Sequence, residues 1–191
     1  MAVNCLIYWG SSALTAGRYH YDFTMAFDRE VPLLPVFVWF YILAFPFWAV
    51  GYLLATRRGK DMFYRFVATD LTIHFICFIC FILIPTTNIR PEIPGNTLSE
   101  KLLALVYSLD GGNSPSNLFP SIHCYVSWMC WKGVEGSEKV PKWYQRFSLV
   151  FAILIIISTQ VLKQHYIVDA AAALLPVSYT HLRAHETLMN L

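Results

Sequence analysis

The sequence predicts an all-α integral membrane protein: a polytopic transmembrane bundle of about six helices, the last of them truncated. The first reason is composition, because only 14% of the 191 residues are charged and 57% are hydrophobic, against about 25% charged in an average soluble domain. The second is a mean hydropathy of +0.49. The third is a series of separate apolar segments of membrane-spanning length. A net charge of +2 is too small to indicate a nucleic-acid partner.

The apolar segments follow one another along the chain, and a spanning helix needs about 20 of their residues. An N-terminal segment, MAVNCLIYWGSSALTAG, is the first candidate helix and carries no basic region typical of a signal peptide. The segment from Pro120 is short for a full span unless its helix continues toward Glu138. The other five predicted helices are Leu34–Ala55, Met62–Pro85, Pro120–Gly133, Phe147–Leu162 and one that begins at Tyr166.

The long connection from Thr86 to Phe119 is rich in turn-forming residues, as in RPEIPG and DGGNSPSN. Inside it, the moderately apolar stretch LSEKLLALVYSL predicts a helix that lies at the membrane interface.

Basic residues orient the bundle, because short cytoplasmic connections collect lysine and arginine. Two connections carry eight of the fourteen basic residues: Arg57, Arg58, Lys60 and Arg65 in one, and Lys132, Lys139, Lys142 and Arg146 in the other. We therefore expect both on the cytoplasmic side. The segment Arg18–Pro32, the connection Thr86–Phe119 and the turn Lys163–His165 then share the opposite face.

The composition changes abruptly after Leu175, where PVSYTHLRAHET replaces an alanine-rich apolar run. This string resembles the in-frame translation of a transposase adapter from sequencing libraries. We therefore interpret residues 1–175 as a single integral membrane domain and residues 176–191 as an artefact, which would interrupt the last helix.

Three polar clusters fall on the predicted non-cytoplasmic face, where ionisable groups beside a membrane indicate function. They are Arg90-Pro91, Pro120-Ser121-Ile122-His123, and the stretch Lys163 to Asp169. Alone, each has a plainer interpretation, such as a satisfied interfacial histidine or an arginine on lipid headgroups. Their shared face, which follows from counting spans, favours a common site.

The residue types in these clusters suit phosphoryl transfer through a phosphohistidine. His165 and Asp169 are four residues apart, so on a helix the carboxylate can hold one ring nitrogen and leave the other as nucleophile or base. Ser121 and His123 begin a helix, whose free N–H groups attract phosphate. Arg90 has a planar fork that fits phosphate with two hydrogen bonds.

These motifs resemble the tripartite signature of the type 2 phosphatidic acid phosphatase superfamily, K-x6-R-P, P-S-G-H and S-R-x5-H-x3-D. The chain matches it at Arg90-Pro91, at Pro120 to His123, and at Ser158 with His165 and Asp169 at the same spacing. The similarity runs from about Tyr21 to Leu175. Within the superfamily, RPEIPG, N-x-FPSxH and KQHY-x-x-D are similar to the branch of inositol phosphorylceramide synthases.

The resemblance implies a role for each residue. His165 would be the nucleophile, Asp169 would hold it, and His123 would protonate the leaving alcohol. Arg90 and Ser121 would bind the phosphate oxygens. The family uses neither a metal nor an organic cofactor, so the implied partners are a lipid phosphate and the bilayer. The implied location is the cell membrane, with the active site on its non-cytoplasmic side.

Two signature cations are absent, because Leu83 and Thr159 stand where the family has lysine and arginine. Lys163 is the candidate replacement for phosphate binding, although on a regular helix it would point about 200° away from His165. Three interpretations stay open: a lipid phosphomonoesterase, a transferase that passes the phosphoryl group of a diester to an alcohol, or a silent lipid-binding or transport module. Asp70 and His74, four residues apart within a span, are expected to satisfy each other structurally.

Overall fold

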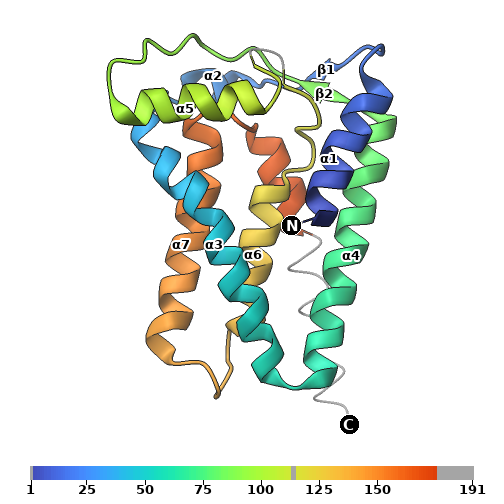
Figure 1. Cartoon of the computed structure of the whole chain (residues 1–191), viewed down its shortest axis with the longest axis vertical. Coiled ribbons are helices and arrows are strands. Elements are labelled where there is room, and N and C mark those ends of the chain that lie inside the picture. Colours follow the sequence, from blue (N-terminus) through green and yellow to red (C-terminus); the bar gives the residue numbers. More distant parts are fainter. Residues whose placement is uncertain (1, 113–114, 176–191) are drawn as a thin grey trace.

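The computed structural model describes residues 2–112 and 115–175, and they form a bundle of roughly aligned helices (Figure 1). Each of the six predicted helices is present. The bundle helices are α1 (Ala2–Thr15), α3 (Val38–Ala55), α4 (Lys60–Leu83), α6 (Ile122–Val134) and α7 (Lys142–Val161), and residues 167–175 are also helical. The predicted all-α class is confirmed. Residues 176–191, which the sequence predicts to be an artefact, lie outside the described residues.

Three helical segments of the described chain are long and apolar enough to cross a membrane. They are Pro35–Arg58, Lys60–Leu83 and Lys142–Val161, of 24, 24 and 20 residues. At 1.5 Å per residue they reach about 30–36 Å, the thickness of the hydrocarbon core. Large apolar side chains such as Leu53 and Phe75 are more than 60% exposed on them, as expected of helix faces that meet lipid.

Helix α6 has only 13 residues, ends at Val134 and so does not continue toward Glu138; it occupies the centre of the bundle. It packs on α3, α4 and α7, and its Cys124, Tyr125 and Val126 are almost completely buried. Glycines permit the close approach. A Cβ added to Gly51 of α3 would lie 2.6 Å from the Cys130 sulfur, and one added to Gly133 would lie 2.7 Å from the Phe66 ring.

The predicted boundaries shift where proline or polar residues begin a helix. Pro35 starts the 3-10 turn η1 (Pro35–Phe37), which precedes α3. Helix α7 begins five residues before the predicted Phe147, because Pro141 at its N-cap allows the basic, amphipathic stretch from Lys142 to form the first turns.

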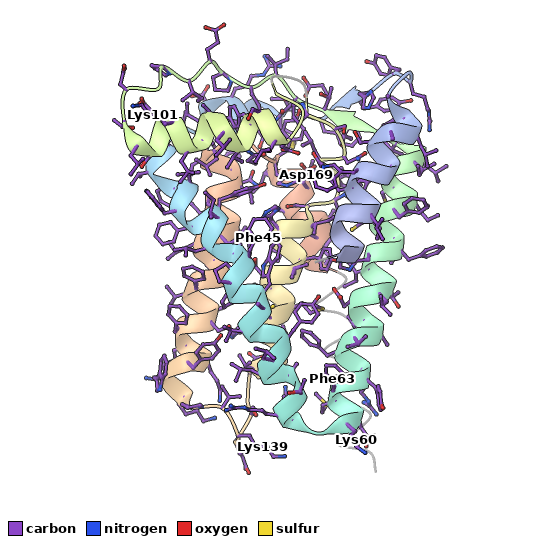
Figure 2. All side chains as sticks on the ribbon, viewed as in Figure 1. Phe45, Lys60, Phe63, Lys101, Lys139 and Asp169 are labelled. Atoms are coloured by element: carbon purple, nitrogen blue, oxygen red, sulfur yellow. The ribbon has the colours of Figure 1, made fainter. Side chains whose placement is uncertain are left out.

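The two ends of the bundle differ in character. At one end, the 3-10 turn η2 (Thr56–Arg58) joins α3 to α4, and a second loop joins α6 to α7. At the other end, α5 (Leu98–Leu109) lies across the bundle (Figure 1), which confirms the predicted extra helix. Unpredicted are α2 (Ala26–Glu30) and a short parallel pairing of β1 (Tyr21–Asp22) with β2 (Thr86–Thr87). Figure 2 places Lys60 and Lys139 at the end opposite Asp169.

Candidate active site

The fold brings the three predicted clusters together at the end of the bundle that carries α5. Arg90 lies just after β2, His123 lies in the first turn of α6, and His165 lies in the turn between α7 and residues 167–175. Arg90 and His165 line one pocket, and His123 and His165 line a second. The imidazole of His165 therefore stands between the two.

His165 is held through one ring nitrogen. Its Nδ1 lies 2.9 Å from the backbone oxygen of Leu118 and 3.3 Å from Asp169 Oδ2. Because both neighbours are acceptors, Nδ1 carries the proton in neutral imidazole and Nε2 keeps its lone pair. The side chain of His165 is 9% exposed and that of Asp169 is completely buried. The expected contact between His165 and Asp169 is present. The Leu118 carbonyl, which the sequence did not reveal as a partner, contacts the same ring nitrogen.

The local backbone explains how His165 and Asp169 meet. Helix α7 ends at Val161, and the N–H groups of Gln164 and His165 both donate to the Thr159 carbonyl, at 2.9 and 3.1 Å. The histidine therefore lies before the next helix rather than within it. Asp169 lies in the first turn of that helix, where its Oδ2 also accepts the Tyr166 N–H at 3.0 Å.

The turn also redirects Lys163. Its φ of 53° is left-handed, so the regular-helix geometry that would point it away from His165 does not apply. Its Nζ donates to the carbonyl of Asp28 at 2.6 Å and to that of Val31, and it lines the same pocket as Arg90 and His165. Burial lowers the pKa of the Lys163 ammonium, while the nearby Asp28 partly offsets this effect.

His123 sits among aromatic rings. It stacks on Tyr41 with ring centroids 4.2 Å apart and also contacts Phe45 and Trp48, at 5.7 and 5.0 Å. Its Nε2 is buried and has no hydrogen-bond partner among the described residues. The His123 and His165 centroids are 6.3 Å apart, so the two rings do not stack on each other but are close enough to contact one phosphate group.

Arg90 is in the expected place, but protein groups already occupy its fork. Nη1 donates to the carbonyls of Asp110 and Gly112, at 3.1 and 3.2 Å. Nη2 donates to the Asp110 carboxylate and to Gln164 Oε1, and the guanidinium lies 4.6 Å from the Tyr107 ring centre. Within the described chain only Nε lacks a partner. Two-bond recognition of phosphate by Arg90 therefore requires one of these contacts to open.

Ser121, and the two residues that stand where the signature has lysine and arginine, do not line the two pockets among the described residues. Ser121 is the N-cap of α6, where its hydroxyl accepts a hydrogen bond from the Cys124 N–H at 3.3 Å. Leu83 ends α4 and is 64% exposed. Thr159 is fully buried, and its carbonyl accepts the two N–H bonds that shape the His165 turn.

The two pockets differ in chemistry. The apolar pocket, of about 250 Å³, is walled by Tyr41, Phe45 and Trp48 and contains both histidines, and no described lysine or arginine lines it. The polar pocket, of about 360 Å³, contains Arg29, Arg90 and Lys163 beside His165. It also contains Asn88 and Gln160, whose amide oxygens are buried without a partner among the described residues. The first pocket therefore suits apolar groups, and the second suits anionic or polar groups.

Sequence reasoning missed Asp110 and Gln164, both of which contact Arg90. Gln164 directly precedes His165, and Asp110 opens DGGNSPSN, which the sequence predicts only as a turn. The polar residue just before the nucleophile candidate was therefore a usable signal, whereas the pairing of Asp110 with Arg90 twenty residues earlier was not.

The second histidine–aspartate pair, His74 and Asp70, is buried inside the bundle, away from the two pockets. His74 Nδ1 lies 3.1 Å from Asp70 Oδ1, and the Tyr125 hydroxyl lies 2.7 Å from His74 Nε2. All three are buried inside the bundle. The expected contact is present, and none of the three lines either pocket.

Comparison with known proteins identifies a family. The family model described as the PAP2 superfamily matches residues 19–182. Neither a curated protein nor a solved structure matches the chain.

Proposed function

Because the chain belongs to the PAP2 superfamily, which supports a phosphatase-type activity, we propose that it is a membrane-embedded lipid phosphatase that acts through a phosphohistidine at His165. The observation that carries this proposal is the state of the two imidazoles. His165 presents a free Nε2 between an apolar and a polar pocket, and His123 presents an unpartnered Nε2 in the apolar one.

The pockets orient the substrate. The lipid alcohol lies in the apolar pocket beside His123, and the phosphoryl oxygens lie toward Arg90 and Lys163 in the polar pocket. Nε2 of His165 attacks phosphorus and the bond from phosphorus to the lipid oxygen breaks. His123, which takes up a proton once the anionic phosphate lies beside it, gives that proton to the lipid oxygen. Water then attacks phosphorus, the bond between phosphorus and Nε2 of His165 breaks, His123 takes a proton from the water, and inorganic phosphate leaves. Neither step is routed through a metal.

Asp169 stabilises the charge that develops on the imidazole. Phosphorylation of Nε2 while Nδ1 keeps its proton gives the ring a positive charge, and the buried carboxylate lies 3.3 Å from Nδ1. The Leu118 carbonyl, 2.9 Å from the same nitrogen, fixes the tautomer independently of that charge. Asp169 therefore acts mainly through electrostatics and Leu118 through orientation.

The end of the bundle that carries the site is assigned to the non-cytoplasmic side of the cell membrane. The opposite end carries the two basic connections, including Lys60 and Lys139 (Figure 2), and cytoplasmic connections are typically basic. Labelling of single cysteines placed at residue 60 and at residue 92 by an impermeant reagent in intact cells tests this orientation, because only the second should react.

The polar pocket favours a second candidate, a transferase that acts on a phosphodiester. The pocket is several times larger than a phosphate group, and the unpartnered oxygens of Asn88 and Gln160 are suited to accept hydrogen bonds from hydroxyls. A hydroxyl-rich headgroup on the phosphate would fill it. The resemblance to inositol phosphorylceramide synthases favours the same reaction, in which the phosphoryl group, still carrying its headgroup, would pass from His165 to an alcohol instead of to water.

The test is phosphate release by the full chain in detergent, from a panel of lipid phosphates with chelator present. Release that persists with chelator and disappears in His165→Ala supports the phosphatase. Headgroup transfer from a phosphodiester to an added alcohol, without phosphate release, supports the transferase. If the purified, folded chain does neither but still binds the lipids, the silent module is the correct interpretation.

A further inference from the structure

Asp110 occupies an unexpected place for a site that binds an anion. Its Oδ2 accepts from Arg90 Nη2, and its Oδ1 accepts from the Tyr8 hydroxyl of α1. It also lines the apolar pocket together with His123 and His165. A phosphate that reaches His165 from this pocket therefore meets a carboxylate. Arg90, the cation that should attract it, is paired with that carboxylate and among the described lining residues belongs to the polar pocket.

The charges around His165 balance. The described residues that line the two pockets include three cationic side chains, Arg29, Arg90 and Lys163, and two carboxylates, Asp28 and Asp110. The third carboxylate is Asp169, directly against His165. With neutral histidines the site has no net charge, so a phosphate with two negative charges is left poorly neutralised. A phosphate with one negative charge costs much less to bind.

We propose that Asp110 is a specificity-determining residue, which makes the site favour phosphates with one negative charge over those with two. This inference rests on the proposed function, because it concerns the phosphate that His165 attacks. Asp110 acts through its charge and through Arg90, whose fork it occupies, so that substrate competes with an internal carboxylate for the guanidinium. Phosphodiesters, and phosphomonoesters in their singly ionised form, are the preferred substrates.

Asp110→Asn removes the negative charge of the side chain while keeping its size and shape nearly unchanged. The amide oxygen can still accept from Arg90, and the amide NH₂ can donate to the Tyr8 hydroxyl oxygen in place of the bond that the carboxylate accepted. For an assumed separation of roughly 8–10 Å between the carboxylate and a bound phosphate, and an effective dielectric of about 20, removal of the charge changes affinity by about 15- to 35-fold for each charge on the ligand. The dianion gains twice in free energy what the monoanion gains.

The experiment measures binding in a His165→Ala background, so that no turnover interferes. The probes are lysophosphatidic acid at pH 8, mostly a dianion, and its phosphomethyl ester, a monoanion of nearly the same shape. Asp110→Asn should raise the affinity for lysophosphatidic acid at least tenfold more than the affinity for the methyl ester. Asp110→Glu should keep the original preference, and Glu92→Gln, which removes an exposed carboxylate from the same end of the molecule, should leave it unchanged.

An equal change for both ligands in Asp110→Asn would assign Asp110 a structural role and overturn the proposal. If Asp110→Asn does not fold, two results decide: Asp110→Glu should retain the preference, and binding by the His165→Ala protein should depend on pH. Affinity for lysophosphatidic acid should fall as its second proton leaves, while affinity for the methyl ester stays level. A level titration for both ligands overturns the proposal. The proposed function fails separately, through absence of turnover by the protein with His165 intact.

Discussion

Replacement of Asp169 by asparagine should slow the reaction without changing substrate binding. The carboxylate lies 3.3 Å from His165 Nδ1 and is completely buried, so its charge faces the imidazole that becomes positive during phosphoryl transfer. With the charges about 4.5 Å apart and an effective dielectric of about 20, the interaction is worth about 3.7 kcal/mol, or a few hundredfold in rate. The Leu118 carbonyl continues to hold the tautomer, so the loss should remain below the ten-thousandfold that a misplaced tautomer produces.

The assay is steady-state phosphate release from a lipid phosphate in detergent, with kcat and KM determined separately. Asp70→Asn is the matched control, because Asp70 and His74 form a second buried pair at 3.1 Å that lines neither pocket among the described residues. Asp70→Asn should lower the melting temperature and leave kcat of the folded protein unchanged. A loss in kcat below tenfold for Asp169→Asn, or a loss confined to KM, would refute the electrostatic role.

Three further predictions concern other parts of the structure. His123→Gln removes the proton donor and should lower kcat by about 10²- to 10⁴-fold in the same assay, most strongly for substrates with poor leaving groups; an equal loss for activated aryl phosphates would argue against an acid role. Gly51→Val places side-chain atoms against Cys130, because a Cβ at residue 51 would already lie 2.6 Å from the sulfur. It should lower the free energy of unfolding by about 1–3 kcal/mol, measured as a lower melting temperature. Gly10→Val is the control and should destabilise the protein less, since nothing lies within 4 Å of a Cβ at residue 10. Thr97→Ala removes the N-cap of α5, which accepts the Glu100 N–H at 3.2 Å, and should destabilise that helix by about 1 kcal/mol; hydrogen exchange of α5 that does not rise would contradict this.

The membrane helices were predictable because their signal is local. Runs of about 20 apolar residues indicate spans, and short basic connections predict an orientation, without tertiary information. The same counting placed Arg90, His123 and His165 at one end of the bundle, and the structure brings them together there. The boundaries moved where a proline such as Pro35 or Pro141 sets the first turn.

The detailed site was not predictable because its decisive contacts join distant segments. The left-handed backbone of Lys163 cannot be inferred from KQHY, yet it determines where the ammonium points. The occupied fork of Arg90 depends on Asp110 twenty residues later, and the orientation of His165 depends on the Leu118 carbonyl 47 residues earlier. A backbone carbonyl leaves no residue-type signal in a sequence.

The most direct test of the central claim is to look for the covalent intermediate. The full chain is mixed briefly with a lipid phosphate in detergent and chelator, quenched at alkaline pH where phosphohistidine is stable, and digested for mass spectrometry. A phosphoryl group, or a phosphoryl group that still carries its headgroup, should appear on the peptide that contains His165 and be absent from His165→Ala. Substrate turnover with no adduct on His165, or turnover that persists in His165→Ala, would contradict the phosphohistidine mechanism.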